Sequence, residues 1–201
     1  MRVLSELGYD ALNAGTGELL AGPTALREIG HGSPALVSAN GAFALQDAPR
    51  DALKPYVIKQ VGGRRVALVG VTDGGAGAYG SVKPASLPAD ALRALLPEVK
   101  AKADFVVVLA DVDLPSVRDL ADQGLDVDVL LGARSTIKRE PTMIGKTLVA
   151  NAGGLVRYVD RLTITLTPDG RVASFDYQEV AVDDSVPDDQ AIAQLRSAYK
   201  G

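Results

Sequence analysis

Apolar and polar residues alternate along this chain in a pattern that predicts strands and helices in turn, followed by antiparallel hairpins. The pattern is strongest between residues 105 and 136, where two strand-sized apolar runs flank a helical segment. These runs are FVVVLADVD at 105–113 and VDVLLGARST at 127–136. Residues 88–102 repeat apolar side chains at helical spacing, which predicts a further helix. This order is typical of a mixed α/β sandwich.

Shorter elements precede and follow this central part. Before it we expect the end of a helix over 2–8, a short strand over 9–15, a helix near 23–30 and a buried strand over 35–40. The other elements that we expect are a hairpin over 55–72, a strand over 146–153, a hairpin over 157–182 and a terminal helix from about Pro187. In the second hairpin apolar residues alternate with threonines, and Pro168-Asp169-Gly170 supplies the turn.

Length and composition narrow the classes of function. The 201 residues suit one domain, 1–201, in which 183–201 form a C-terminal tail and helix. A net charge of -4, no tryptophan and 4% aromatic residues argue against a nucleic-acid surface. The apolar runs are too short for membrane insertion, and Met1 leads into an amphipathic pattern rather than a signal peptide. With no cysteine and one histidine, thiolate and imidazole chemistry is nearly excluded.

Polar residues end the two strongest predicted strands. Asp111 and Asp113 close the first, and Arg134, Ser135 and Thr136 close the second. Open α/β sheets place their ligand sites at the carboxyl ends of their strands. We therefore regard this edge as the candidate site.

Six segments carry motifs that occur in one known family. They are GYDALNAGTGE (8–18), LVSAN (36–40), PYVIKQVGGRRVALVGVT (55–72), FVVVLADVD (105–113), DVDVLLGARST (126–136) and TLVANAGGLVRYVDRLTITL (147–166). Their order and spacing over residues 1–170 resemble the metallophosphatase domain of the 5′-nucleotidase family of metallophosphoesterases, the calcineurin-like fold. The resemblance implies a mixed-sheet αββα sandwich and an extracytoplasmic or periplasmic location. It also implies two divalent metals, which activate a hydroxide against a phosphoester.

The motifs depart from the family where its chemistry lies. The Asn-His pair of the family's GNHE motif is Thr16-Gly17 here, which leaves Glu18. Asp111 replaces the histidine of an SH motif, and Arg134 and Thr136 replace the two histidines of GHxH. The family's earlier ligands and first strands would lie upstream of Met1, so the resemblance implies an N-terminally truncated sandwich.

These replacements predict a degenerate site. One carboxylate at Asp111 does not rebuild a two-metal centre, and Arg134 would place a positive charge against the metals. We assign no catalytic residue and expect no cofactor. If catalysis survives, we expect two divalent metals with ligands supplied from outside this chain.

Weaker candidates each have a plainer structural interpretation. Asp111, Asp113 and Glu18 could bind a cation, but Asp113 precedes Leu114-Pro115 and suits a helix cap, and Glu18 suits a cap or tether. Arg134, Ser135 and Thr136 could hold an anion, but the loop ARSTIKRE is also typical of solvated mixed charge.

Two further features carry no function in our interpretation. Residues 75–80 match GxGxxG, but Pro84 breaks the helix that a dinucleotide loop requires. His31 lies in a Gly/Pro-flanked turn without an acidic neighbour, which favours an exposed loop over a ligand.

Three functions follow from these observations. The first is a non-catalytic scaffold or interaction module of the metallophosphoesterase type, with an exposed sheet edge covered by a protein partner, a preceding domain or a second copy. The second is a residual metal-dependent phosphoesterase or nucleotidase that uses Asp111, Asp113 and Glu18. The third is anion or nucleotide binding without turnover at Arg134.

Overall fold

A six-stranded mixed sheet forms the centre of the computed structural model, with strand order β3-β4-β5-β6-β8-β7. The structure describes residues 2–30, 34–41, 53–75, 83–134, 140–152 and 158–199. The helices are α1 (Arg2–Glu6), α2 (Thr16–Leu20), α3 (Gly22–Gly30), α4 (Pro88–Lys102), α5 (Leu114–Asp122) and α6 (Gln190–Tyr199). The strands are β1 (Ala11–Asn13), β2 (Ala35–Val37), β3 (Tyr56–Val61), β4 (Arg64–Thr72), β5 (Phe105–Asp113), β6 (Val129–Arg134), β7 (Thr142–Ile144), β8 (Thr147–Asn151), β9 (Tyr158–Leu166) and β10 (Val172–Ala181).

Four of these strands run parallel in the middle of the sheet. β4, β5, β6 and β8 pair in parallel, and β3 and β7 close the two edges antiparallel. Their carboxyl ends therefore lie along one edge of the sheet. Helical crossovers connect β4 to β5 through α4 and β5 to β6 through α5, as parallel pairing requires.

Strand β5 shows how the sequence sorts side chains between the two faces of the sheet. Val106, Val108 and Val112 are buried in the large core cluster that includes side chains of α4 and α5. The residues between them face the opposite way, because side chains alternate across a strand. Phe105 thus packs with the β9–β10 hairpin. Asp111 lies an even number of residues further along the strand, so its side chain lies on the same face as Phe105.

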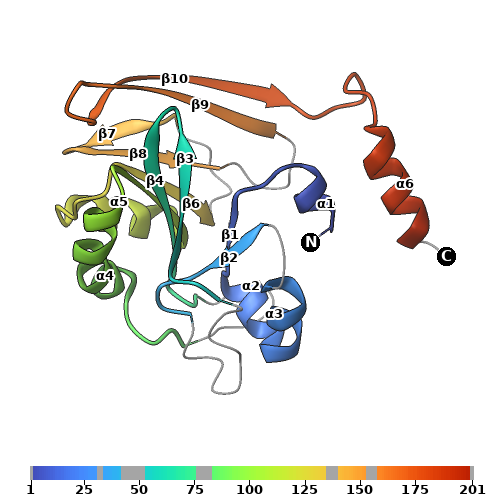
Figure 1. Cartoon of the computed structure of the whole chain (residues 1–201), viewed down its shortest axis with the longest axis horizontal. Helices are drawn as coiled ribbons and strands as arrows, with labels where there is room; N and C mark the ends of the chain where they lie inside the picture. The colour runs from blue at the N-terminus through green and yellow to red at the C-terminus, as the bar shows by residue number, and fades with distance from the viewer. Residues whose placement is uncertain are drawn as a thin grey trace.

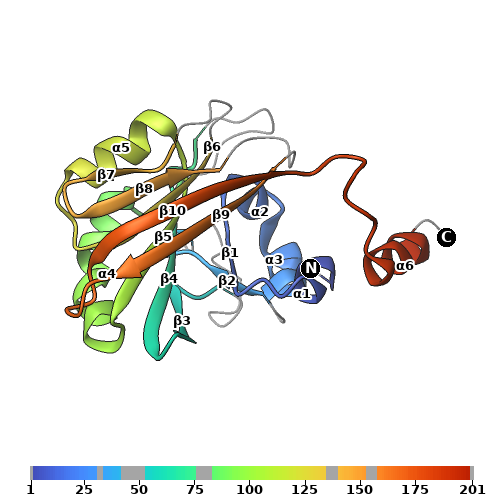
Figure 2. The same ribbon diagram turned by 90° about the horizontal axis from the view of Figure 1, so that it is seen from above.

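The β9–β10 hairpin covers the second face of the six-stranded sheet (Figures 1 and 2). Leu162, Ile164 and Leu166 are half-buried against it, and the threonines between them are exposed. The alternation predicted for this hairpin is therefore confirmed. Fully burying an aliphatic side chain of this kind stabilises a fold by about 1.5–3 kcal/mol.

A small parallel pair, β1–β2, forms the rest of the second layer. Its side chains pack with α2 and α3 in a separate core that contains Ala14, Leu19 and Leu26. The pair is joined to β4, because the Asn13 side-chain amide donates to the Val71 carbonyl at 2.8 Å. The order helices, sheet, sheet, helices is the predicted αββα sandwich.

Some predicted elements differ in detail. The sequence did not predict α2 or β7, which are five and three residues long and too short for a periodic signal. The strand expected over 35–40 ends at Val37, and the terminal helix begins at Gln190 rather than near Pro187. That helix, α6, lies beside α1 at the margin of the molecule (Figure 1). In the described part of the chain, every helix is too short or too polar to cross a membrane.

Candidate functional site

The carboxyl ends of β4, β5 and β6 bring together charged side chains from three separate parts of the sequence. Thr72 lies beside Asp111 in the register of β4 and β5, and Asp113 lies beside Arg134 in that of β5 and β6. Asp73 follows directly after β4. The sheet edge predicted as the candidate site is therefore a cluster of Asp73, Asp111 and Arg134, called the edge cluster below.

Asp111 is bound by donors of its own chain. Its Oδ2 accepts from the Thr16 backbone N–H at 2.7 Å, from the Thr16 hydroxyl at 2.9 Å and from the Thr72 hydroxyl at 3.0 Å. Its side chain is 14% exposed. Hydrogen bonds to an ionised carboxylate are about twice as strong as neutral ones. Asp111 therefore fastens α2 to the sheet.

Gly15 permits this close approach. A Cβ at that position would lie 2.8 Å from Asp111 Cγ, closer than side chains pack. Glycine at the turn before α2 thus lets the carboxylate reach the Thr16 N–H.

Arg134 lies between the other two members of the edge cluster. Its Nη2 is 2.6 Å from both oxygens of Asp73, and its Nε is 3.9 Å from Asp111 Oδ1. The Arg134 and Asp73 side chains are 27% and 26% exposed, so water screens this pair less than it screens a surface pair. The guanidinium that the sequence offered as an anion site is therefore bound by a carboxylate that reaches it from the end of β4.

The loop after β4 covers the guanidinium. Gly75 donates its backbone N–H to Asp73 Oδ1 at 2.8 Å, and a Cβ on Gly75 would collide with Arg134 Nη1. That Nη1 atom is buried and has no hydrogen-bond partner within the described part of the chain. The loop thus packs directly on the charged group.

The other two predicted carboxylates act as helix caps. Asp113 Oδ1 accepts from the Ser116 N–H at 2.9 Å at the start of α5. Hydrogen bonding to the Ser116 side chain, and then to its backbone N–H, holds the pKa of Asp113 below its usual range. Glu18 Oε2 accepts from the Gly15 N–H at 3.1 Å at the start of α2. These contacts are the capping roles that residue preferences predict.

The remaining sequence candidates lie outside the described residues. They are Ser135, Thr136, His31 and residues 76–80 of the glycine-rich match.

Sequence reasoning missed Asp73, Thr72 and Asn40. Asn40 donates to the Thr72 carbonyl at 2.7 Å and accepts from the Thr72 N–H at 3.0 Å, which fixes the end of β4. A signal for Asp73 was present, because it follows a buried strand just as Asp111 closes one. The motifs gave it no role, since the hairpin motif ends at Thr72 and the next motif begins at Phe105.

The residues at this edge do not fit the two divalent metals that the resemblance implies. Hard dications need six or more oxygen ligands, or several carboxylates and imidazoles that converge on one point. Over the ranges that the structure describes, no group of three or more His, Cys, Asp or Glu side chains has that arrangement. A fixed guanidinium instead stands beside the two carboxylates.

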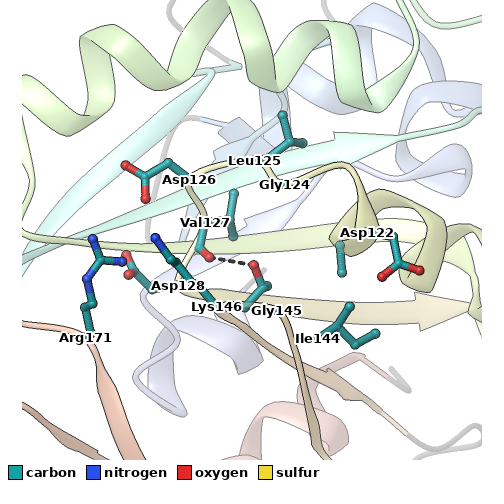
Figure 3. Close-up of a pocket in the computed structure, with 12 residues that line it drawn as sticks. Asp122, Gly124, Leu125, Asp126, Val127, Asp128, Ile144, Gly145, Lys146 and Arg171 are labelled. Atoms are coloured by element: carbon teal, nitrogen blue, oxygen red, sulfur yellow. Dashed lines mark hydrogen bonds between the residues drawn. The ribbon is translucent and has the colours of Figure 1, made fainter.

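A different pocket lies at the opposite end of the sheet. It has a volume of about 460 Å³ and is formed where β6 and β8 begin, with Asp126, Asp128 and Lys146 around it (Figure 3). Asp128 accepts from the Val106 N–H at 2.8 Å and from Lys100 at 3.2 Å. The Thr147 hydroxyl donates to the Val127 carbonyl at 2.8 Å (dashed in Figure 3). These contacts secure the loop that enters β6, and no candidate from the sequence lies here.

Comparison with solved structures identifies the fold. A 5′-nucleotidase precursor from Thermus thermophilus matches with a TM-score of 0.78 and 23% identity, over 98% of this chain and 44% of that one. The sulfate thiohydrolase SoxB of Thermus thermophilus matches with a TM-score of 0.79 and 18% identity, over 98% and 37%. The NAD nucleotidase NadN of Haemophilus influenzae matches with a TM-score of 0.65 and 17% identity, over 90% and 41%.

The chain thus has the mixed α/β fold of 5′-nucleotidase-type proteins, as its motifs predicted. It spans less than half the length of each of these three proteins. No protein-family model matches the chain, and no curated protein matches it.

Proposed function

We propose that this chain is a catalytically inactive 5′-nucleotidase-like domain that serves as a scaffold or interaction module. The observation that carries the proposal is the bond between Arg134 and Asp73 at the edge where this fold is expected to hold its metals. A positive charge fixed beside Asp111 opposes the binding of a dication to that carboxylate.

The hydrogen bonds that Asp111 already accepts support the same conclusion. Its Oδ2 already receives three hydrogen bonds from Thr16 and Thr72. A metal ligand at this oxygen would have to displace donors that also hold α2 in place. The carboxylate is therefore better suited to a structural role than to ligation.

The open end of the β9–β10 hairpin is the surface that we propose for interaction. From Gln178 to Ala181 consecutive residues of β10 are exposed, whereas alternate residues nearer the turn are half-buried. Val159 and Val180 lie opposite each other there and are 57% and 51% exposed. Exposed edge strands with apolar side chains readily pair with another strand.

A second copy of this chain is the partner that we propose for the hairpin. An antiparallel edge can pair with its own copy about a two-fold axis, and two-fold dimers are the commonest oligomers. Sedimentation should show a dimer whose population rises with concentration and that Val180→Lys abolishes. Val182→Lys, just beyond the end of β10, is the matched control and should weaken the dimer less. A wild type that stays monomeric at every concentration would exclude the second copy.

An extracytoplasmic location is part of the proposal. It rests on the likeness of the fold to that of a 5′-nucleotidase precursor. Fractionation of the cells that make the protein tests it, and a purely cytoplasmic signal would refute it.

Catalytic inactivity is tested by hydrolysis. Wild type and Asp111→Asn are each incubated with Mn²⁺ and chromogenic phosphomonoesters and phosphodiesters. We expect both rates to equal that of Mn²⁺ alone. A Mn²⁺-dependent rate that Asp111→Asn removes would refute the proposed inactivity and favour the alternative, a residual phosphoesterase.

A further inference from the structure

The edge cluster has a feature that an ordinary surface ion pair lacks. Its two carboxylates come from the ends of neighbouring parallel strands, and one guanidinium is close to both. Asp73 and Arg134 are 61 residues apart in the sequence. The fold, rather than local sequence, therefore brings the three charges together.

We propose that Arg134 is the resident cation of this sheet edge and that it excludes divalent cations from Asp73 and Asp111. Arginine suits this role because its guanidinium carries a permanent positive charge, and here its Nη2 contacts both oxygens of Asp73. It thus supplies permanently the positive charge that a bound metal would otherwise supply. The inference adds a specific role for Arg134 to the proposed function and does not depend on the interaction surface.

The packing around Arg134 is consistent with a permanent occupant. The loop at Gly75 lies against Nη1, where a Cβ would collide with it. That nitrogen is buried without a hydrogen-bond partner in the described residues, an arrangement that is unfavourable for a polar group. The site therefore keeps the guanidinium even though one of its nitrogens is not satisfied.

Removal of the guanidinium leaves acceptors that attract a dication. Both oxygens of Asp73 lose their Arg134 donor, and Asp111 Oδ1 loses its nearby charge. The partial exposure of Asp73 and Arg134 lets water complete a six-oxygen shell. A structural ion pair with no such role would lose stability on substitution, but it would gain no affinity for metal.

The experiment measures Mn²⁺ affinity by isothermal titration of the full chain. We expect Arg134→Gln to bind Mn²⁺ roughly tenfold or more tightly than wild type, because an uncompensated carboxylate pair replaces a neutralised one. Arg134→Lys retains the charge and should stay close to wild type. Adding Asp111→Asn to Arg134→Gln should remove the gain.

Lys59 of β3 offers a matched control within the same sheet. It forms an ion pair with Asp10 at 3.1 Å in which both side chains are exposed, so its removal leaves an exposed carboxylate in water. Lys59→Gln changes the net charge as Arg134→Gln does, and we expect it to leave Mn²⁺ affinity unchanged. An equal gain in both variants would mean that net charge alone attracts the metal, and it would overturn the inference.

Two further outcomes would also overturn it. One is a folded Arg134→Gln that binds Mn²⁺ no more tightly than wild type, and the other is a wild type that already binds as tightly as the variant. If Arg134→Gln fails to fold alone, Mn²⁺ present during refolding should restore it, and failure of that rescue counts against the inference. Metal-independent hydrolysis by wild type would refute the proposed inactivity and leave this inference standing.

Discussion

The two ends of the six-stranded sheet each hold a cation between two carboxylates, yet the two arrangements differ. At the carboxyl end, Arg134 contacts side chains from β5 and from the end of β4. At the amino end, Lys100 of α4 contacts Asp126 and Asp128, which are neighbours in one loop and are 69% and 12% exposed. The first arrangement draws its carboxylates from the ends of two neighbouring strands, and the second draws both from one loop. Charge composition and burial do not distinguish the two arrangements, whereas the origin of their carboxylates does.

The largest expected difference is in stability. Arg134→Ala leaves two partly buried carboxylates without their cation, so we expect it to lower the free energy of unfolding by about 2–3 kcal/mol. Lys100→Ala leaves Asp128 its hydrogen bond from the Val106 N–H and leaves Asp126 in water, so it should cost less, about 1 kcal/mol. Urea unfolding followed by circular dichroism measures both. A larger loss in Lys100→Ala would break the comparison.

Adding one methyl group tests whether the loop packs on the guanidinium. A Cβ at position 75 would collide with Arg134 Nη1, so Gly75→Ala should cost about 1–2 kcal/mol. Gly17 lies inside α2 with open space around its Cα, so Gly17→Ala should stabilise by up to about 1 kcal/mol. In thermal unfolding, Gly75→Ala should therefore lower the Tm and Gly17→Ala should raise it. A neutral Gly75→Ala would show that the loop can move away.

Loss of the α5 cap should have a smaller effect. Asp113→Ala removes the acceptor for the Ser116 N–H and should lower the free energy of unfolding by about 1 kcal/mol. Asp113→Ser retains an acceptor and should recover most of the lost free energy of unfolding. If Asp113 ligated a metal instead, Mn²⁺ would stabilise wild type and would fail to stabilise Asp113→Ser.

The smallest effect concerns pH and lies away from the edge cluster. Hydrogen bonds from Arg65 lower the pKa of Asp104 to about 2, from 3.8. The folded pKa is depressed, so the contribution of Asp104 is present above about pH 4 and is lost as the pH falls towards 2. The free energy of unfolding of wild type should therefore exceed that of Asp104→Asn by less and less as the pH falls across that window. A difference that stays constant down to pH 2 would contradict the lowered pKa of Asp104.

The sequence predicted the fold well because its strongest signals are local. The apolar runs of β5 and β6, the helical spacing of α4 and the alternation in β9 each specify an element by themselves. The end of β5 as a site edge was also predictable, since strand ends in parallel sheets converge.

The contacts within that edge could not be predicted from the sequence. Whether Arg134 meets an external anion or Asp73 depends on the path of the loop after β4, which no periodic pattern encodes. The attachment of Thr16 to Asp111 likewise joins residues 95 positions apart. The short elements α2 and β7 were missed because tertiary contacts, rather than propensity, form them.

Metal content tests the central claim most directly. Purified wild type is incubated with Mn²⁺ and Zn²⁺, dialysed, and analysed for bound metal by elemental analysis. Because Arg134 occupies the sheet edge with Asp73 and Asp111, we predict less than one retained dication per chain. Two retained dications per chain would show that the edge holds a metal centre, and would contradict the account.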